Sequence, residues 1–157
     1  MAKSLSLFMR DTEEKIVVIP GVDSIRDENG DVVDLEVKVL DNKTIRKIQN
    51  LYRKKTVAHD KKGNPLVSGG EIVFKQENDG DKALRHVIAE ALVYPNLKDK
   101  ELQDFYKCYD IADLLLVVFN RPEEYNDVVH RVMIELGMIS RADTEDTNEK
   151  EIEEAKN

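Results

Sequence analysis

The chain has 157 residues, of which 32 are acidic and 24 are basic, giving a net charge of -8. This length suits one domain that buries about 70% of its unfolded surface. One Cys, three His, no Trp and seven Gly exclude a disulfide scaffold, a zinc ribbon and an iron-sulfur protein, and the acidic balance excludes a basic nucleic-acid-binding domain.

The first elements have the period of two that is typical of strands. Alternating apolar residues across 33–39 predict a strand with one buried face, and Ile16–Ile19 predicts a partner strand. Turn-forming residues at Asp27–Asp31 separate the two. We expect an antiparallel hairpin or a three-stranded meander. Asp41 or Asn42 then caps a helix whose apolar face carries Ile45, Ile48, Leu51 and Tyr52.

The middle of the chain predicts a second hairpin. Strand-like residues cover 56–76, with a turn at Lys62–Pro65 and a strand at Glu71–Lys75.

After this point the apolar period is 3.6. Leu84, Val87, Ile88, Ala91 and Leu92 predict a helix that ends near Val93, because Tyr94 precedes Pro95. Asp99 and Asp110 are expected to cap helices over 99–106 and 110–119. The last helix is predicted over 121–136, with Asn120 as its cap, Pro122 in its first turn and Gly137 after its end.

The predicted fold class is α+β, in a single domain over residues 1–139. Its β-rich part, 15–76, has an N-terminal antiparallel β-hairpin region with one early helix, and its helical subdomain covers 82–137. Residues 140–157 contain three basic and seven acidic residues, and we expect a disordered acidic tail there.

No catalytic, cofactor-binding or metal-ligating residue is assigned. The glycine pair Gly69-Gly70 is followed by Glu71, so it does not form a phosphate loop. Calcium-loop spacing fails because Ile25 and Lys75 occupy ligand positions. The three histidines, His59, His86 and His130, are too far apart in sequence for a helical zinc pair and are interpreted as exposed surface residues. Cys108 is interpreted as a partly buried structural thiol, although a Cys-His hydrolase would follow if folding brought His86 or His130 to it.

One stretch is strongly basic. Eight basic residues and one acidic residue lie between Lys43 and Lys62. This basic segment either docks an acidic partner or nucleic acid, or is a solvated surface paired with the acidic tail. Nucleic acid is disfavoured because Tyr52 is the one aromatic residue in the stretch. The candidate partner-binding residues are Lys43, Arg46, Lys47, Arg53, Lys54 and Lys55.

Residues 1–10 lack the pattern of a signal peptide, and the longest apolar run, Leu114–Phe119, has six residues against the roughly 20 of a membrane span. These features predict a cytoplasmic protein without a membrane segment, and the lone Cys108 fits a reducing compartment. A homo-oligomer is compatible with the sequence, which does not fix the number of copies.

The segment Tyr94–Tyr106, YPNLKDKELQDFY, resembles the XkdN-like tail assembly chaperones of phages and prophages with contractile tails. Weaker agreement lies at Leu7–Arg10, Lys54-Lys55, Leu114-Leu115 and Glu124-Tyr125. Lys107 and Glu123 stand where that family has glycine.

The resemblance implies a non-enzymatic protein in the cytoplasm of a bacterial host. Such a protein binds the phage tape-measure protein, keeps it soluble and helps recruit tail-tube protein. The alternative from another class is a small cytosolic adaptor or regulatory protein that uses residues 43–62 to dock an acidic partner or nucleic acid.

Overall fold

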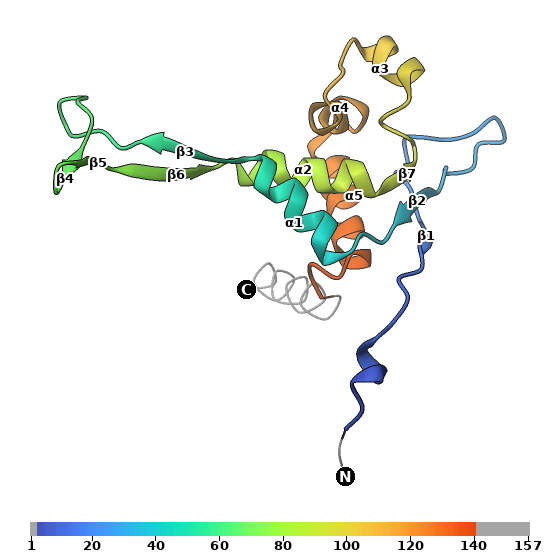
Figure 1. Cartoon of the computed structure of the whole chain (residues 1–157). Coiled ribbons are helices and arrows are strands. Elements are labelled where there is room, and N and C mark those ends of the chain that lie inside the picture. Colours follow the sequence, from blue (N-terminus) through green and yellow to red (C-terminus); the bar gives the residue numbers. More distant parts are fainter. Residues whose placement is uncertain (1–2, 141–157) are drawn as a thin grey trace, which may run out of the picture.

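The computed structural model describes residues 3–140, so the predicted acidic tail lies outside the described residues apart from Ser140. Helices and antiparallel strands combine in one chain, which confirms the α+β class. Three parts are distinct in Figure 1: a helical body, a small sheet at its side, and a long two-stranded arm. None of the described helices is long and apolar enough to cross a membrane.

The small sheet has strand order β1-β2-β7, all antiparallel. Strands β1 (Ile16–Ile19) and β2 (Leu35–Lys38) form the predicted hairpin, with Ile16 opposite Lys38. The third strand, β7 (Leu92–Tyr94), lies much later in the sequence than β1 and β2. Of the two predicted alternatives, the hairpin is therefore confirmed and the three-stranded meander is wrong. Backbone pairing of Leu92 with Val37 also ends the preceding helix two residues earlier than predicted.

Helix α1 (Asn42–Leu51) follows β2 and begins as predicted. The carboxylate of Asp41 accepts a hydrogen bond from the amide of Thr44 at 2.8 Å, which satisfies a free donor of the first turn. Ile48 is buried and Ile45 is half-buried against the body. Leu51 is a correction: it belongs to the predicted apolar face, but its side chain is 62% exposed because the chain turns out into the arm there.

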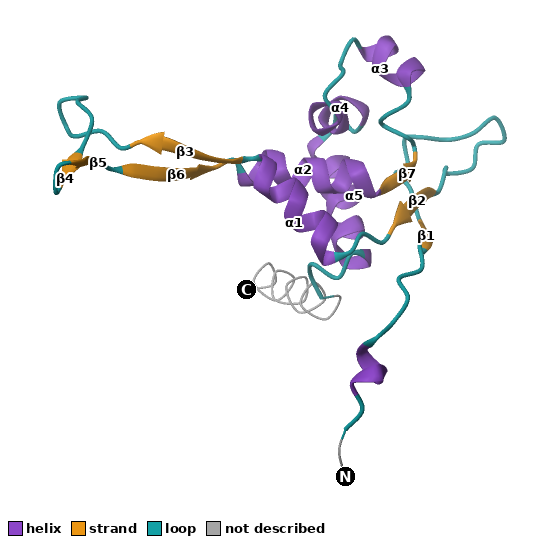
Figure 2. Cartoon of the chain, in the orientation of Figure 1, coloured by secondary structure: helices purple, strands orange, loops and turns teal. Residues whose placement is uncertain are grey.

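The arm is a longer version of the predicted second hairpin. Strand β3 (Arg53–Val57) pairs with β6 (Phe74–Asn78), and the short strands β4 (Val67–Ser68) and β5 (Glu71–Ile72) form its tip. The carboxylate of Asp60 accepts hydrogen bonds from the amides of Lys62 and Asn64, which closes the predicted turn. No residue of the arm is buried, and Figure 2 shows the ribbon projecting alone from the helices.

The body is built around α2 (Gly80–Ala91), which packs against α1, α4 (Ile111–Val118) and α5 (Pro122–Glu135). Its fully buried side chains include Val87, Ile88, Leu114, Leu115, Phe119, Val128 and Val132. The predicted Asn120 cap was wrong. Pro122 takes the first helical position, so Arg121 is the N-cap residue. The Arg121 side chain makes no cap hydrogen bond. The short helix α3 (Lys100–Tyr106) is capped by Asp99 as predicted and lies at the edge of the body (Figure 1).

Candidate partner-binding surfaces

Among the described residues, no group of three or more His, Cys, Asp or Glu side chains could hold a metal ion. Cys108 is half-buried, as predicted, and its Sγ lies 3.7 Å from the carbonyl oxygen of Asp110. The prediction that all three histidines are exposed was wrong for His86 and His130, which are half-buried. His86 faces Tyr52 at the root of the arm, so its ring packs within the protein.

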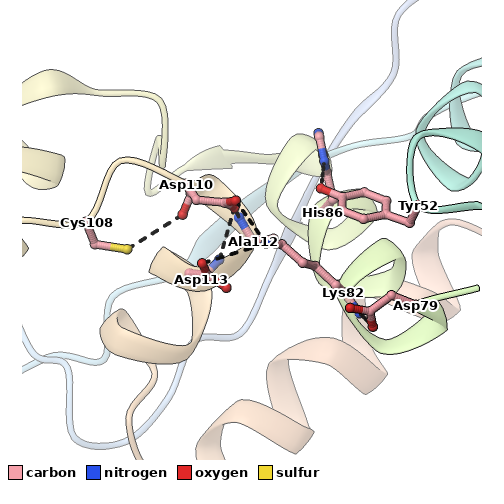
Figure 3. A network of polar contacts seen from close by, with 8 residues as sticks. All are labelled: Tyr52, Asp79, Lys82, His86, Cys108, Asp110, Ala112 and Asp113. Atoms are coloured by element: carbon pink, nitrogen blue, oxygen red, sulfur yellow. Dashed lines mark hydrogen bonds and ion pairs between the residues drawn. The ribbon is translucent and has the colours of Figure 1, made fainter. Parts of the chain in front are cut away.

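Polar contacts join α2 to the end of α1 and to α4 near the base of the arm (Figure 3). The Tyr52 hydroxyl lies 2.6 Å from Nδ1 of His86, and the amide of Asp79 donates to the Tyr52 carbonyl at 3.1 Å. Burial lowers the pKa of His86 and raises that of Tyr52, so both groups are neutral at pH 7. In the neutral tautomer that carries its proton on Nε2, the Nδ1 of His86 accepts a hydrogen bond from the Tyr52 hydroxyl. This contact ties the end of α1 to the middle of α2.

The second half of the network joins α2 to α4. The Lys82 ammonium lies 3.2 Å from a carboxylate oxygen of Asp110 and 3.9 Å from one of Asp113. The hydrogen bond to Asp110 raises the pKa of Lys82. Burial acts to raise the pKa of Asp110, but hydrogen bonds from Lys82 and the amides of Ala112 and Asp113 outweigh it and lower that pKa. These contacts join the first turn of α2 to the N-terminal end of α4.

The basic segment is divided by the fold. All six candidate residues are exposed, with Lys43, Arg46 and Lys47 on α1 and the other three on β3. Successive strand residues point to opposite faces, so Lys54 projects from one face of the arm and Arg53 and Lys55 from the other. On β6, Lys54 is opposite Glu77. The structure therefore places these cations along one helix and two ribbon faces, and their role in binding stays a prediction.

A different surface combines exposure with apolar character. Tyr94, Phe105, Tyr106 and Tyr109, called here the aromatic face, are 51%, 77%, 37% and 64% exposed. The rings of Phe105 and Tyr106 make an edge-to-face contact with centroids 4.9 Å apart. The Tyr109 hydroxyl donates to the Asp104 carboxylate at 3.1 Å. The segment Tyr94–Tyr106 carries the family resemblance, but its amphipathic pattern does not predict that these rings face solvent.

The backbone leaves α3 in a left-handed conformation. Lys107 has a φ of 52° and a ψ of 41°, the left-handed conformation that ends helices and favours glycine. Lys107 is one of the two positions at which the resemblance implies glycine. Lysine therefore occupies a left-handed position that glycine adopts without steric cost. Glu123 needs no such freedom, because it lies in the first turn of α5.

The chain is similar to known proteins over most of its length. The family model described as phage XkdN-like tail assembly chaperone protein matches residues 5–156. An uncharacterized protein of Bacillus subtilis, YqbN, is 29% identical over 131 residues, which cover 82% of this chain and 80% of YqbN. The crystal structure of the protein YqbN matches with a TM-score of 0.65 and 20% identity, over 87% of this chain and 98% of that one, and supports the fold alone. Because the family match spans nearly the whole sequence and includes the segment that carries the aromatic face, the chain belongs to the phage XkdN-like tail assembly chaperone family.

Proposed function

We propose that the chain is a non-enzymatic chaperone that binds the phage tape-measure protein in the host cytoplasm through the aromatic face. It keeps that long apolar client soluble until tail-tube protein assembles around it. The observation that carries the proposal is the exposure of four aromatic rings on and around the segment that resembles the family, with Phe105 the most exposed at 77%.

Physical chemistry supports an apolar client on this face. Aromatic side chains bury large areas with few rotatable bonds and are enriched among residues that dominate binding energy. The partly exposed residues Leu116 and Val117 of α4 add apolar surface on a helix that α3 contacts. These rings lie on the surface of the folded body and are not part of its hydrophobic core. Such a surface can exchange clients without unfolding the chaperone.

Co-expression with the tape-measure protein encoded in the same locus tests the proposal. We expect this chain to raise the soluble fraction of the tape-measure protein and to be recovered with it on affinity capture. Phe105→Ser should lose both effects. Phe74→Ser is the matched control, because Phe74 is 60% exposed on the arm, away from the aromatic face. A tape-measure protein equally insoluble with and without this chain, together with no complex on capture, would overturn the proposal.

The adaptor alternative has one observation in its favour. Within residues 3–140, none of the six candidate cations forms an ion pair with an acidic side chain. Reversing Arg46, Lys47 and Arg53 to Glu separates the two functions. A steep loss of partner binding with added salt, abolished by this reversal, would favour the adaptor. Unchanged recovery of the tape-measure protein by the reversed variant is expected for the chaperone.

A further inference from the structure

The N-terminal segment, residues 3–10, carries an apolar cluster that the body does not cover. A 3-10 helix, η1, spans Leu5–Phe8, and none of its residues is buried. Leu5, Leu7, Phe8 and Met9 are 74%, 74%, 81% and 76% exposed. Figure 1 shows this segment running away from the sheet into solvent. Four apolar side chains so close together are stabilised when another surface removes them from water.

A groove beside α3 has matching chemistry. It encloses about 400 Å³, and its lining includes the apolar residues Tyr94, Pro95, Leu102 and Phe105. The two charged residues in that lining, Asp99 and Glu101, are both acidic. The N-terminal segment begins with Lys3, ends with Arg10 and contains no acidic residue. An apolar cluster with a cation at each end therefore complements an apolar groove with two anions.

The chain's own segment is held away from its own groove. The Glu14 carboxylate lies 2.8 Å from the ammonium of Lys38, and the amide of Val39 donates to the carbonyl of Lys15 at 2.9 Å. These contacts fix the chain at the end of β2 that carries Lys38. The groove begins at Tyr94, which pairs with Glu36. From Tyr94 the chain continues past the opposite end of β2, which carries Leu35. Three residues, 11–13, separate the segment from Glu14 and span about 10 Å when extended. Figure 1 shows η1 and α3 at opposite ends of the molecule.

We propose that the N-terminal segment of one copy seats in the α3 groove of a second copy, and that reciprocal exchange forms a closed dimer. Both surfaces belong to this chain. Because the groove shares Tyr94 and Phe105 with the aromatic face, the dimer and the tape-measure client compete for it. Phe8 lies outside the aromatic face, so Phe8→Ser should weaken the dimer without loss of the client, which distinguishes the two proposals. A reciprocal contact forms twice per dimer and leaves no groove open. The apolar cluster supplies affinity, and the flanking charges set the direction in which the segment lies.

Sedimentation equilibrium of the full chain measures the dimer. Phe8→Ser and Phe105→Ser should each raise the dimer dissociation constant about tenfold or more, the usual effect of truncating a central aromatic contact. Both residues are exposed, so circular dichroism should show an unchanged fold. Phe74→Ser, the same substitution on the arm, should leave the dissociation constant unchanged. A chain that stays monomeric up to about 200 µM, or a dimer insensitive to both Phe8→Ser and Phe105→Ser, would overturn the proposal.

Disulfide capture tests whether the contact forms between copies. In a Cys108→Ser background, one chain carries Ser6→Cys and another carries Glu101→Cys. Mixing the two and oxidising should give a cross-linked pair of one chain of each kind. A chain that carries both cysteines and cross-links within itself when dilute would show that the segment fills its own groove, which contradicts exchange.

Charge reversal tests the direction of seating. Lys3→Glu with Arg10→Glu should weaken the dimer, and adding Glu101→Lys should restore part of the affinity. No rescue, together with no effect of the reversal itself, would contradict the assigned charge pairing. A weakening that Glu101→Lys deepens would contradict it as well, since that result places the cations against a different surface.

Discussion

The same substitution at two phenylalanines of the helical half should separate an effect on folding from an effect on client binding. Phe119 is 1% exposed in the core, so Phe119→Ala removes a fully buried ring and should lower the free energy of unfolding by about 3–5 kcal/mol. Phe105 is 77% exposed. About a quarter of its surface, roughly 50 Å², is buried, so Phe105→Ala should cost about 1 kcal/mol.

Urea unfolding followed by circular dichroism measures both changes, and recovery of soluble tape-measure protein measures function. A domain of this size has roughly 5–15 kcal/mol of stability, so Phe119→Ala lowers the amount of folded protein while each folded molecule keeps its aromatic face. Phe105→Ala should lower the free energy of unfolding by only about 1 kcal/mol and still lose the client. If Phe105→Ala destabilises the fold as much as Phe119→Ala, the ring supports the core and the reasoning is refuted.

Three further substitutions probe local features. Lys107→Gly should stabilise the fold by about 1 kcal/mol in urea unfolding, because it relieves a left-handed residue; equal or lower stability would contradict this. Gly21→Ala should destabilise it by about 2 kcal/mol in the same assay, because the new Cβ would lie 1.9 Å from the carbonyl oxygen of Val33; a neutral result would mean that the backbone there shifts freely. Burial lowers the pKa of His86 from its ordinary 6.5, so unfolding exposes a better base and stability should fall as the pH drops below 6.5 and level off below the folded pKa. Stability curves measured between pH 5 and 8 should flatten in that window for His86→Gln, and an unchanged slope would assign the effect to another group.

Local patterns predicted the helices well, because the period of 3.6 and the capping residues act over a few neighbouring positions. Asp41, Asp99 and Asp110 each accept the backbone hydrogen bonds expected of a cap. A local signal also predicted the end of α5, because Gly137 lies just after it and has a φ of 74°. Its start was misjudged by one residue, although Pro122 in the first helical position already points to Arg121 as the cap.

Long-range contacts account for the rest. Strand β7 has three residues, and only pairing with β2, more than fifty positions earlier, makes it a strand. The exposure of Phe105 was hidden for the same reason, since Phe105 and Phe119 both lie in apolar helical patterns. Which ring is covered depends on where α3 and α4 sit around α2. The segment that resembles the family could be found from sequence, whereas its exposed aromatic face needed the fold.

The connection between the arm and α2 has a mechanical consequence. Strand β6 ends at Asn78 and α2 begins at Gly80, so a single residue, Asp79, separates the ribbon from the central helix. The Asp79 carboxylate caps α2, and the Asp79 backbone amide donates a hydrogen bond to the Tyr52 carbonyl. Both contacts restrict the backbone where the ribbon meets the helix. Strands β3 and β6 alone extend about 17 Å from it. A load on the tip of the ribbon therefore reaches the core as torque on α2, the helix against which α1, α4 and α5 all pack.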